Sequence, residues 1–105
     1  MAVSADYVNR LVQSLRRNTS DAVTAEVSAL VDEARADMER LGILQSKAED
    51  ETDALIFGAV RDFCKWQFGL GNPDADRYML MYQSRVNELR QSSGYYADST
   101  AEVTG

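Results

Sequence analysis

The feature that most constrains the fold is a pair of helical hydrophobic patterns between Leu55 and Leu89, separated by a short turn sequence. In the first pattern, apolar residues recur at the spacing that places them on one side of a helix turning about 100° per residue, and the opposite side carries Arg61, Asp62 and Lys65. The predicted buried stripe is Leu55, Ile56, Ala59, Val60, Phe63, Cys64 and Trp66. In the second, the apolar residues have the same spacing, and the predicted buried stripe is Ala75, Tyr78, Met79, Tyr82, Val86 and Leu89. Two amphipathic helices joined by so few residues are expected to pack as an antiparallel hairpin.

The turn between the two patterns contains residues with separate local roles. Gly69 and Gly71 break the apolar pattern of the first helix. Asn72 is predicted to cap the second helix, with Pro73 at its first position, where no backbone N–H is needed. Asp74 and Asp76 then lie near the positive end of the helix dipole. The sequence therefore predicts a hinge at Gly69, Asn72 and Pro73.

Two further helices are predicted in the first half of the chain. Ser4 is a candidate N-cap for the first, and a turn at residues 18–21 offers several caps for the second. Gly42 is expected to end the second helix in the left-handed conformation. The predicted buried positions are Tyr7, Val8, Leu11, Val12 and Leu15, then Val23, Val27, Leu30, Val31, Ala34, Met38 and Leu41. The predicted outer face of the second helix is Glu26, Asp32, Glu33, Arg35, Glu39 and Arg40.

These patterns together predict an all-α fold, a small bundle of about four helices with the antiparallel hairpin at its centre. The polar linker 45–52 follows Gly42, with Asp50 or Thr52 expected to cap the helix that comes next. Residues 1–93 are expected to form one helical domain and residues 94–105 a short tail. A short strand in the linker near Ile43 or in the tail is an open alternative. A chain of 105 residues is near the size at which an assembly partner adds useful burial.

Charge and hydropathy exclude several classes of function. The chain has 11 Lys and Arg against 17 Asp and Glu, for a net charge of −6. This balance argues against a free nucleic-acid-binding domain and against binding to an anionic membrane surface. No apolar run approaches the roughly 20 residues of a membrane span, and residues 1–10 lack the apolar core of a signal peptide. We therefore expect the chain to begin in the cytosol, where a single cysteine, Cys64, is unremarkable.

The residues usual in catalysis and metal binding are scarce. The chain has no histidine, which removes Ser–His, Cys–His and His–metal arrangements. Cys64 lies on the apolar stripe beside Phe63, as a core residue would. The acidic run at residues 49–53 lacks the alternating oxygen ligands and central glycine of a calcium loop. We expect no enzyme activity, no cofactor and no metal.

Several large apolar residues lie off the predicted buried stripes. In the first hairpin helix, two phenylalanines lie about 100° or more from the centre of the stripe. In the second, one leucine points almost opposite Tyr82 and one methionine lies to one side. Two adjacent tyrosines follow the last helix, and together these residues suggest a surface that another chain covers. The candidate interface residues are Phe57, Phe68, Leu80, Met81, Tyr95 and Tyr96.

The segment from Asp53 to Tyr82, roughly a third of the chain, resembles the small head–tail connector (head-completion) proteins of long-tailed bacteriophages. The resemblance lies in an aromatic-Cys-Lys sequence, a Phe-Gly pair, an Asn-Pro-Asp-Ala sequence and an Arg-Tyr pair at similar spacing. Here these are Phe63-Cys64-Lys65, Phe68-Gly69, Asn72-Pro73-Asp74-Ala75 and Arg77-Tyr78. Met81 stands where a small polar residue is more usual, and the first half of the chain is similar only in helical rhythm and length.

The resemblance implies a ring of identical subunits, commonly twelve in the assembled particle, docked beneath the portal protein. Such a ring extends the DNA channel and provides the surface for a stopper or tail-completion protein. DNA would pass through without sequence-specific binding. The expected location is the neck of the virion, with the host cytoplasm as the site of assembly.

Two other functions fit the residues. One is a small acidic helical regulatory protein that binds a host or phage protein as a monomer or dimer. The other is a helical nucleic-acid-binding domain that uses the side of the first helix carrying Arg10, Arg16 and Arg17. A steep salt dependence of binding would mark the second of these.

Overall fold

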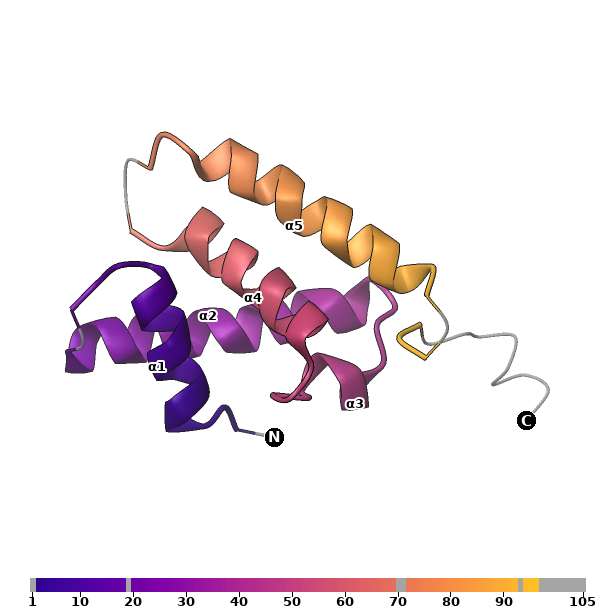
Figure 1. Cartoon of the computed structure of the whole chain (residues 1–105), viewed down its shortest axis with the longest axis horizontal. Coiled ribbons are helices and arrows are strands. Elements are labelled where there is room, and N and C mark those ends of the chain that lie inside the picture. Colours follow the sequence, from indigo (N-terminus) through magenta and orange to yellow (C-terminus); the bar gives the residue numbers. More distant parts are fainter. Residues whose placement is uncertain (1, 19, 70–71, 93, 97–105) are drawn as a thin grey trace.

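A computed structural model describes residues 2–18, 20–69, 72–92 and 94–96, most of which are helical. The helices are α1 (Ala5–Ser14), α2 (Asp21–Arg40), α3 (Gln45–Ala48), α4 (Ala54–Gln67) and α5 (Ala75–Arg90). α4 lies between α2 and α5, and α1 packs against α2 and contacts α4 (Figure 1). The described segments contain no strand, only an isolated antiparallel bridge between Ile43 and Tyr96. The all-α prediction is confirmed.

The ends of α1 and α2 follow from local sequence. Ser4 and Ser20 cap these helices, each hydroxyl oxygen accepting a hydrogen bond from the backbone N–H three residues later at 3.2 Å. Gly42 follows α2 with a φ of 107°, and the backbone N–H of Ile43 donates to the carbonyl oxygen of Met38 at 2.9 Å. This is the Schellman ending, which glycine favours because it has no Cβ to clash in the left-handed region.

The segment between α2 and α4 differs from the prediction. The short helix α3 occupies part of the expected linker and buries Ala48, so the described residues form five helices rather than about four. α4 is capped by Asp53, whose carboxylate accepts from two backbone N–H groups of the first turn at 2.9 and 3.1 Å. The carboxylate of Asp50 instead accepts from the backbone N–H and the hydroxyl of Thr52. These bonds close the preceding turn, so neither Asp50 nor Thr52 caps α4.

The core contains most of the predicted apolar stripes. On α1 and α2 every predicted position is buried except Leu15, Val23 and Leu41, which are half-buried. α4 and α5 add Ile56, Ala59, Val60, Phe63, Cys64, Tyr82, Val86 and Leu89. Among the other predicted positions of α4 and α5, Leu55 is 53% exposed, and four are half-buried: Trp66, Ala75, Tyr78 and Met79. None of the helices in the described ranges is long and apolar enough to cross a bilayer.

Two charged residues expected on outer faces are buried, Arg35 of α2 and Asp62 of α4. The Nη2 atom of Arg35 lies 3.4 Å from a carboxylate oxygen of Glu51, in the turn before α4. The carboxylate of Asp62 is paired with Arg85 of α5. The predicted outward positions of these two residues are therefore wrong. Each charged side chain is covered by, and paired with, a residue of another segment, and the position of that segment cannot be read from the helical periodicity of α2 or α4.

Candidate partner-binding surfaces

Three of the six predicted interface residues are exposed. Leu80 and Met81 on α5 are 60% and 37% exposed, and Tyr96 after α5 is 42% exposed. Leu55 at the start of α4 joins this set, although the sequence placed it in the core. The sequence could not show that Leu55 is exposed, because its apolar side chain and helical position fit a buried residue equally well. The exposed apolar surface thus involves both α4 and α5.

Phe57 is covered by α1. Its ring makes an edge-to-face contact with the ring of Tyr7, with centroids 5.3 Å apart, and the guanidinium carbon of Arg10 lies 4.2 Å from its centroid. The expectation that Phe57 is turned away from the intramolecular core is wrong, because α1 packs over this side of α4. The contact also occupies Arg10, the first of the three arginines in the nucleic-acid hypothesis.

Phe68 and Tyr95 also have intramolecular partners. Phe68 is half-buried, with the guanidinium carbon of Arg17 5.2 Å from its ring centroid. The hydroxyl of Tyr95 donates to the carboxylate of Asp53 at 2.7 Å, which raises the pKa of the phenol. The carbonyl oxygen of Tyr95 accepts from the backbone N–H of Leu44 at 2.8 Å. The start of the predicted tail is therefore attached to the helical body, and residues 97–105 lie outside the described residues.

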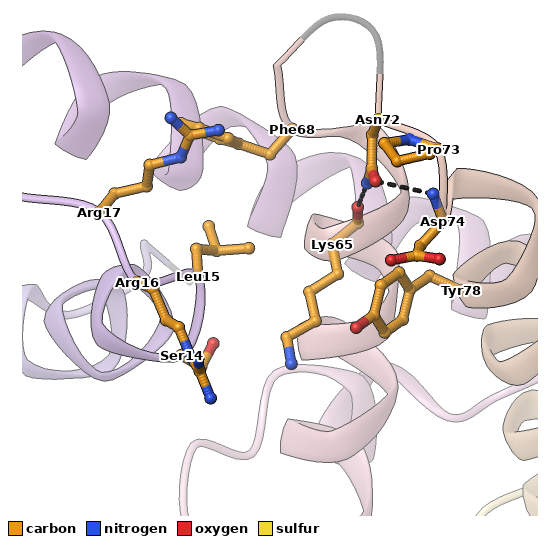
Figure 2. Close-up of a pocket in the computed structure, with 10 residues that line it drawn as sticks. All are labelled: Ser14, Leu15, Arg16, Arg17, Lys65, Phe68, Asn72, Pro73, Asp74 and Tyr78. Atoms are coloured by element: carbon orange, nitrogen blue, oxygen red, sulfur yellow. Dashed lines mark hydrogen bonds between the residues drawn. The ribbon is translucent and has the colours of Figure 1, made fainter.

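The hinge is arranged differently from the prediction. Asn72 donates from Nδ2 to the carbonyl oxygen of Lys65 at 2.8 Å and accepts at Oδ1 from the backbone N–H of Asp74 at 2.9 Å (Figure 2). α5 begins at Ala75, so Asn72 is not its N-cap and Pro73 is not its first residue. The reason is that the Asn72 side chain closes a turn and ties it to the end of α4 before the next helix starts.

Gly69 lies just past the end of α4, where the break in the apolar pattern predicts the end of the helix. Its φ is 75°, in the left-handed region directly after the end of α4. Its backbone N–H donates to a carboxylate oxygen of Glu26 on α2 at 3.3 Å. The hinge is thereby connected to α2 as well as to α4.

A groove of about 500 Å³ lies beside the hinge, between the end of α1 and the ends of α4 and α5 that meet there (Figure 2). Apolar surface comes from Leu15, Phe68, Pro73 and Tyr78. The other lining residues are Ser14, Arg16, Arg17, Lys65, Asn72 and Asp74. The groove therefore combines apolar walls with three cationic side chains, two from the α1 end and one from α4.

The three cations, Arg16, Arg17 and Lys65, are called the groove cations below. The Nζ atom of Lys65 lies 5.3 Å from the ring centroid of Tyr78, and Arg17 lies over Phe68. Among the residues whose placement is described, no carboxylate lies within ion-pair distance of any groove cation. Their charges are available to an anionic partner.

Arg16 has an unusual backbone. It follows α1 with a φ of 57°, and it is the only non-glycine residue with positive φ in the described segments. The backbone N–H of Arg17 donates to Val12 O at 3.3 Å, so α1 has the same ending as α2 but with arginine where glycine is preferred. This conformation costs an L-residue about 1 kcal/mol or more.

The described residues offer little for catalysis. Cys64 is fully buried, and burial raises the pKa of its thiol to about 12, so the thiolate is scarce at neutral pH. Its predicted place in the core is confirmed. Within the described ranges, no three Cys, Asp or Glu side chains are grouped to hold a metal ion.

Comparison with protein-family models, with curated proteins and with solved structures found no match to this chain. The exposed apolar residues and the groove are therefore the features from which function can be argued.

Proposed function

We propose that this chain is a subunit of a head–tail connector ring of a long-tailed bacteriophage. Docked beneath the portal protein, a ring of about twelve such subunits would extend the DNA channel and hold the stopper or tail-completion protein. The residues that resemble connector proteins lie in α4, the hinge and the first part of α5. In this proposal α4 and α5 act as one antiparallel hairpin, held at the hinge by the hydrogen bonds of Asn72.

The observation that carries the proposal is the exposure of large apolar side chains on this pair of helices. Leu80, Met81 and Leu55 are all more than a third exposed, although most other large apolar residues of the described helices are buried or half-buried. Covering a leucine side chain completely contributes about 1.5–3 kcal/mol, and a ring repeats each contact at every subunit boundary. Apolar surface of this kind supports an assembly function.

The charge of the chain is compatible with a channel wall. A net charge of −6 disfavours phosphate binding, so DNA would pass without sequence-specific contacts. The ring would reside in the neck of the virion after assembly in the host cytoplasm. The portal protein on one side and the stopper or tail-completion protein on the other would be its partners.

The substitution Leu80→Asp tests the proposal, with Ser84→Asp as the matched control. Ser84 is exposed on the same helix one turn later, so both variants gain one negative charge at a solvated position. Both should stay helical with near-parental melting temperatures, because neither side chain is buried. Only Leu80→Asp should lose the ring, because it places an unpaired charge in the contact. Light scattering after size exclusion, with and without purified portal protein, measures assembly, and circular dichroism measures folding.

The same measurements distinguish the connector ring from the rival function. A wild-type chain that stays monomeric or dimeric in the presence of portal protein would favour the small acidic regulatory protein. Rings formed equally well by Leu80→Asp and Ser84→Asp would place the subunit contact away from Leu80. A version of the test at Phe57 is less useful, because Phe57→Asp would disrupt the contact between α1 and α4.

A further inference from the structure

We propose that the groove beside the hinge binds the acidic outer face of α2 in a second copy of this chain. The inference rests on the proposed function, because it adds a charged part to the contact between neighbouring subunits of the ring, in addition to the apolar part that includes Leu80. In this contact, the groove cations Arg16, Arg17 and Lys65 of one subunit face the outer side of α2 of the next subunit.

The groove is suited to an anionic partner that also has apolar surface. The groove cations have no carboxylate partner in the described part of the chain, and Leu15 lies between them (Figure 2). The one lining carboxylate, Asp74, lies 3.7 Å from the Nη2 atom of Arg77, which offsets its charge. Arg17 and Lys65 rest on aromatic rings, which restricts their side chains before a partner arrives.

The backbone of Arg16 is an independent sign of function at the groove. Glycine would adopt its left-handed conformation without steric cost, and Gly42 does so at the corresponding position after α2. Strained residues of this kind concentrate at binding sites, where the side chain has a task. Here the strained residue contributes a third cation to the lining of the groove.

The outer face of α2 has the complementary character. Its exposed positions recur every three or four residues, so they form one continuous face. They are Ala22, Ala25, Glu26, Ala29, Asp32, Glu33 and Ala36, and Asp21 and Arg40 are also exposed at the two ends of the helix. Alanine side chains allow a partner to approach closely. Asp32 and Glu33 have no cation within ion-pair distance among the described residues, so both are available to the groove cations.

The two surfaces belong to different elements, so the contact would be heterologous. A contact between unlike faces joins subunits head to tail and closes into a ring when the rotation allows it. A nucleic acid fits the groove less well, because the net charge of −6 repels a polyphosphate. In addition, Arg10 lies on Phe57 instead of extending the cationic surface.

The test uses two full-length charge-reversed variants. The groove variant carries Arg17→Glu and Lys65→Glu, and the face variant carries Asp32→Lys and Glu33→Lys. Each alone should lose the ring under conditions in which the wild type assembles, because like charges then meet at every contact. An equimolar mixture should regain rings that contain both variants in alternation, because each supplies the surface complementary to the other. Native mass spectrometry measures the size and composition of the rings.

Two further variants control for charge and folding. Arg90→Glu changes the charge by as much as Arg17→Glu at an exposed position outside the groove, and it should assemble normally. Arg16→Gly removes a groove cation without adding a negative charge, and it should weaken assembly while melting no lower than the wild type. Circular dichroism confirms that each variant is folded.

The outcomes distinguish the two proposals. A wild-type chain that remains monomeric at high concentration and with portal protein overturns the connector proposal and this contact with it. Wild-type rings together with normal rings from both reversed variants overturn the contact alone. Loss of assembly by only the groove variant, or no rescue on mixing, also overturns it. Steeply salt-dependent binding of duplex DNA by the wild type, lost in the groove variant, would assign the groove to nucleic acid instead.

Discussion

Arg85 of α5 forms an ion pair with Asp62 of α4, and the side chain of Asp62 is only 2% exposed. The guanidinium lies where a side chain at Gly58 would begin, since a Cβ there would be 3.0 Å from Nη1 of Arg85. This arrangement explains a glycine in the middle of α4, where it disfavours the helix by about 1 kcal/mol relative to alanine. It also explains a buried charge at a position that the sequence assigned to solvent.

Arg85→Ala should lower the free energy of unfolding by about 3 kcal/mol, because it leaves the Asp62 carboxylate buried without its main partner. The remaining cation, Arg61, is 4.0 Å from that carboxylate. Arg77→Ala is the control, since its pair with Asp74 is exposed on both sides and should contribute less than about 1 kcal/mol. Urea unfolding measures both, and equal small losses would contradict a structural role for the Arg85 pair.

Gly58→Ala should couple to Arg85. In the wild type, the higher helix propensity of alanine stabilises the fold, but its Cβ displaces the guanidinium of Arg85, which destabilises it. In an Arg85→Ala background only the stabilising effect remains. The substitution should therefore be more favourable in that background, by at least about 0.5 kcal/mol. A double-mutant cycle from urea unfolding gives this number. Additive effects would mean that Arg85 does not occupy the space over Gly58.

Asn72→Ala should lower the free energy of unfolding by about 1–2 kcal/mol, because it removes both side-chain hydrogen bonds that close the hinge. Pro73→Ala should change stability by less, since Pro73 lies before the first turn of α5 and acts mainly through chain entropy. Asn72→Asp keeps the acceptor for Asp74 but sets a carboxylate oxygen against the carbonyl oxygen of Lys65, so its loss should be at least as large as that of Asn72→Ala. Thermal and urea melts of the three variants would show whether this order holds.

Arg16→Gly should raise the free energy of unfolding by about 1 kcal/mol, because glycine relieves the left-handed strain after α1. Arg16→Ala removes the same side chain and keeps the strain, so it should change stability little. The difference between the two variants in urea melts isolates the backbone effect. A gain for alanine as large as for glycine would show that the side chain, and not the φ of 57°, is unfavourable.

Stability should fall above pH 9 in part through Cys64. Burial raises the pKa of its thiol from 9.0 to about 12, so above pH 9 the unfolded chain loses this proton while the folded chain keeps it. The group then lowers the free energy of unfolding by about 1.4 kcal/mol for each pH unit up to about pH 12. Burial also raises the pKa of Tyr7 to about 12, which adds to the loss above pH 10. Urea melts at pH 8, 9 and 10 should show a shallower decline for Cys64→Ala than for the wild type.

The sequence determined the four longer helices and several of their ends, but not the short helix α3. Ser4, Ser20 and Gly42 act within one turn of their own positions, so their roles depend on neighbours that the sequence itself specifies. The same is true of the buried stripe of α2, because period and hydrophobicity fix which side of a helix is apolar. The hinge was located in the same way, although the side chain of Asn72 makes its bonds with Lys65 and Asp74 and does not cap α5.

Only the tertiary structure decided which outer positions are covered. Phe57 is covered by α1, Arg35 by its pairing with Glu51, and Asp62 by Arg85, while Leu55 is left exposed. It also brought the end of α1 beside the hinge and so formed the groove. Helical phase gives the direction of a side chain relative to its own helix axis. Burial and charge pairing depend on what lies in that direction, and the packing of distant helices alone determines it.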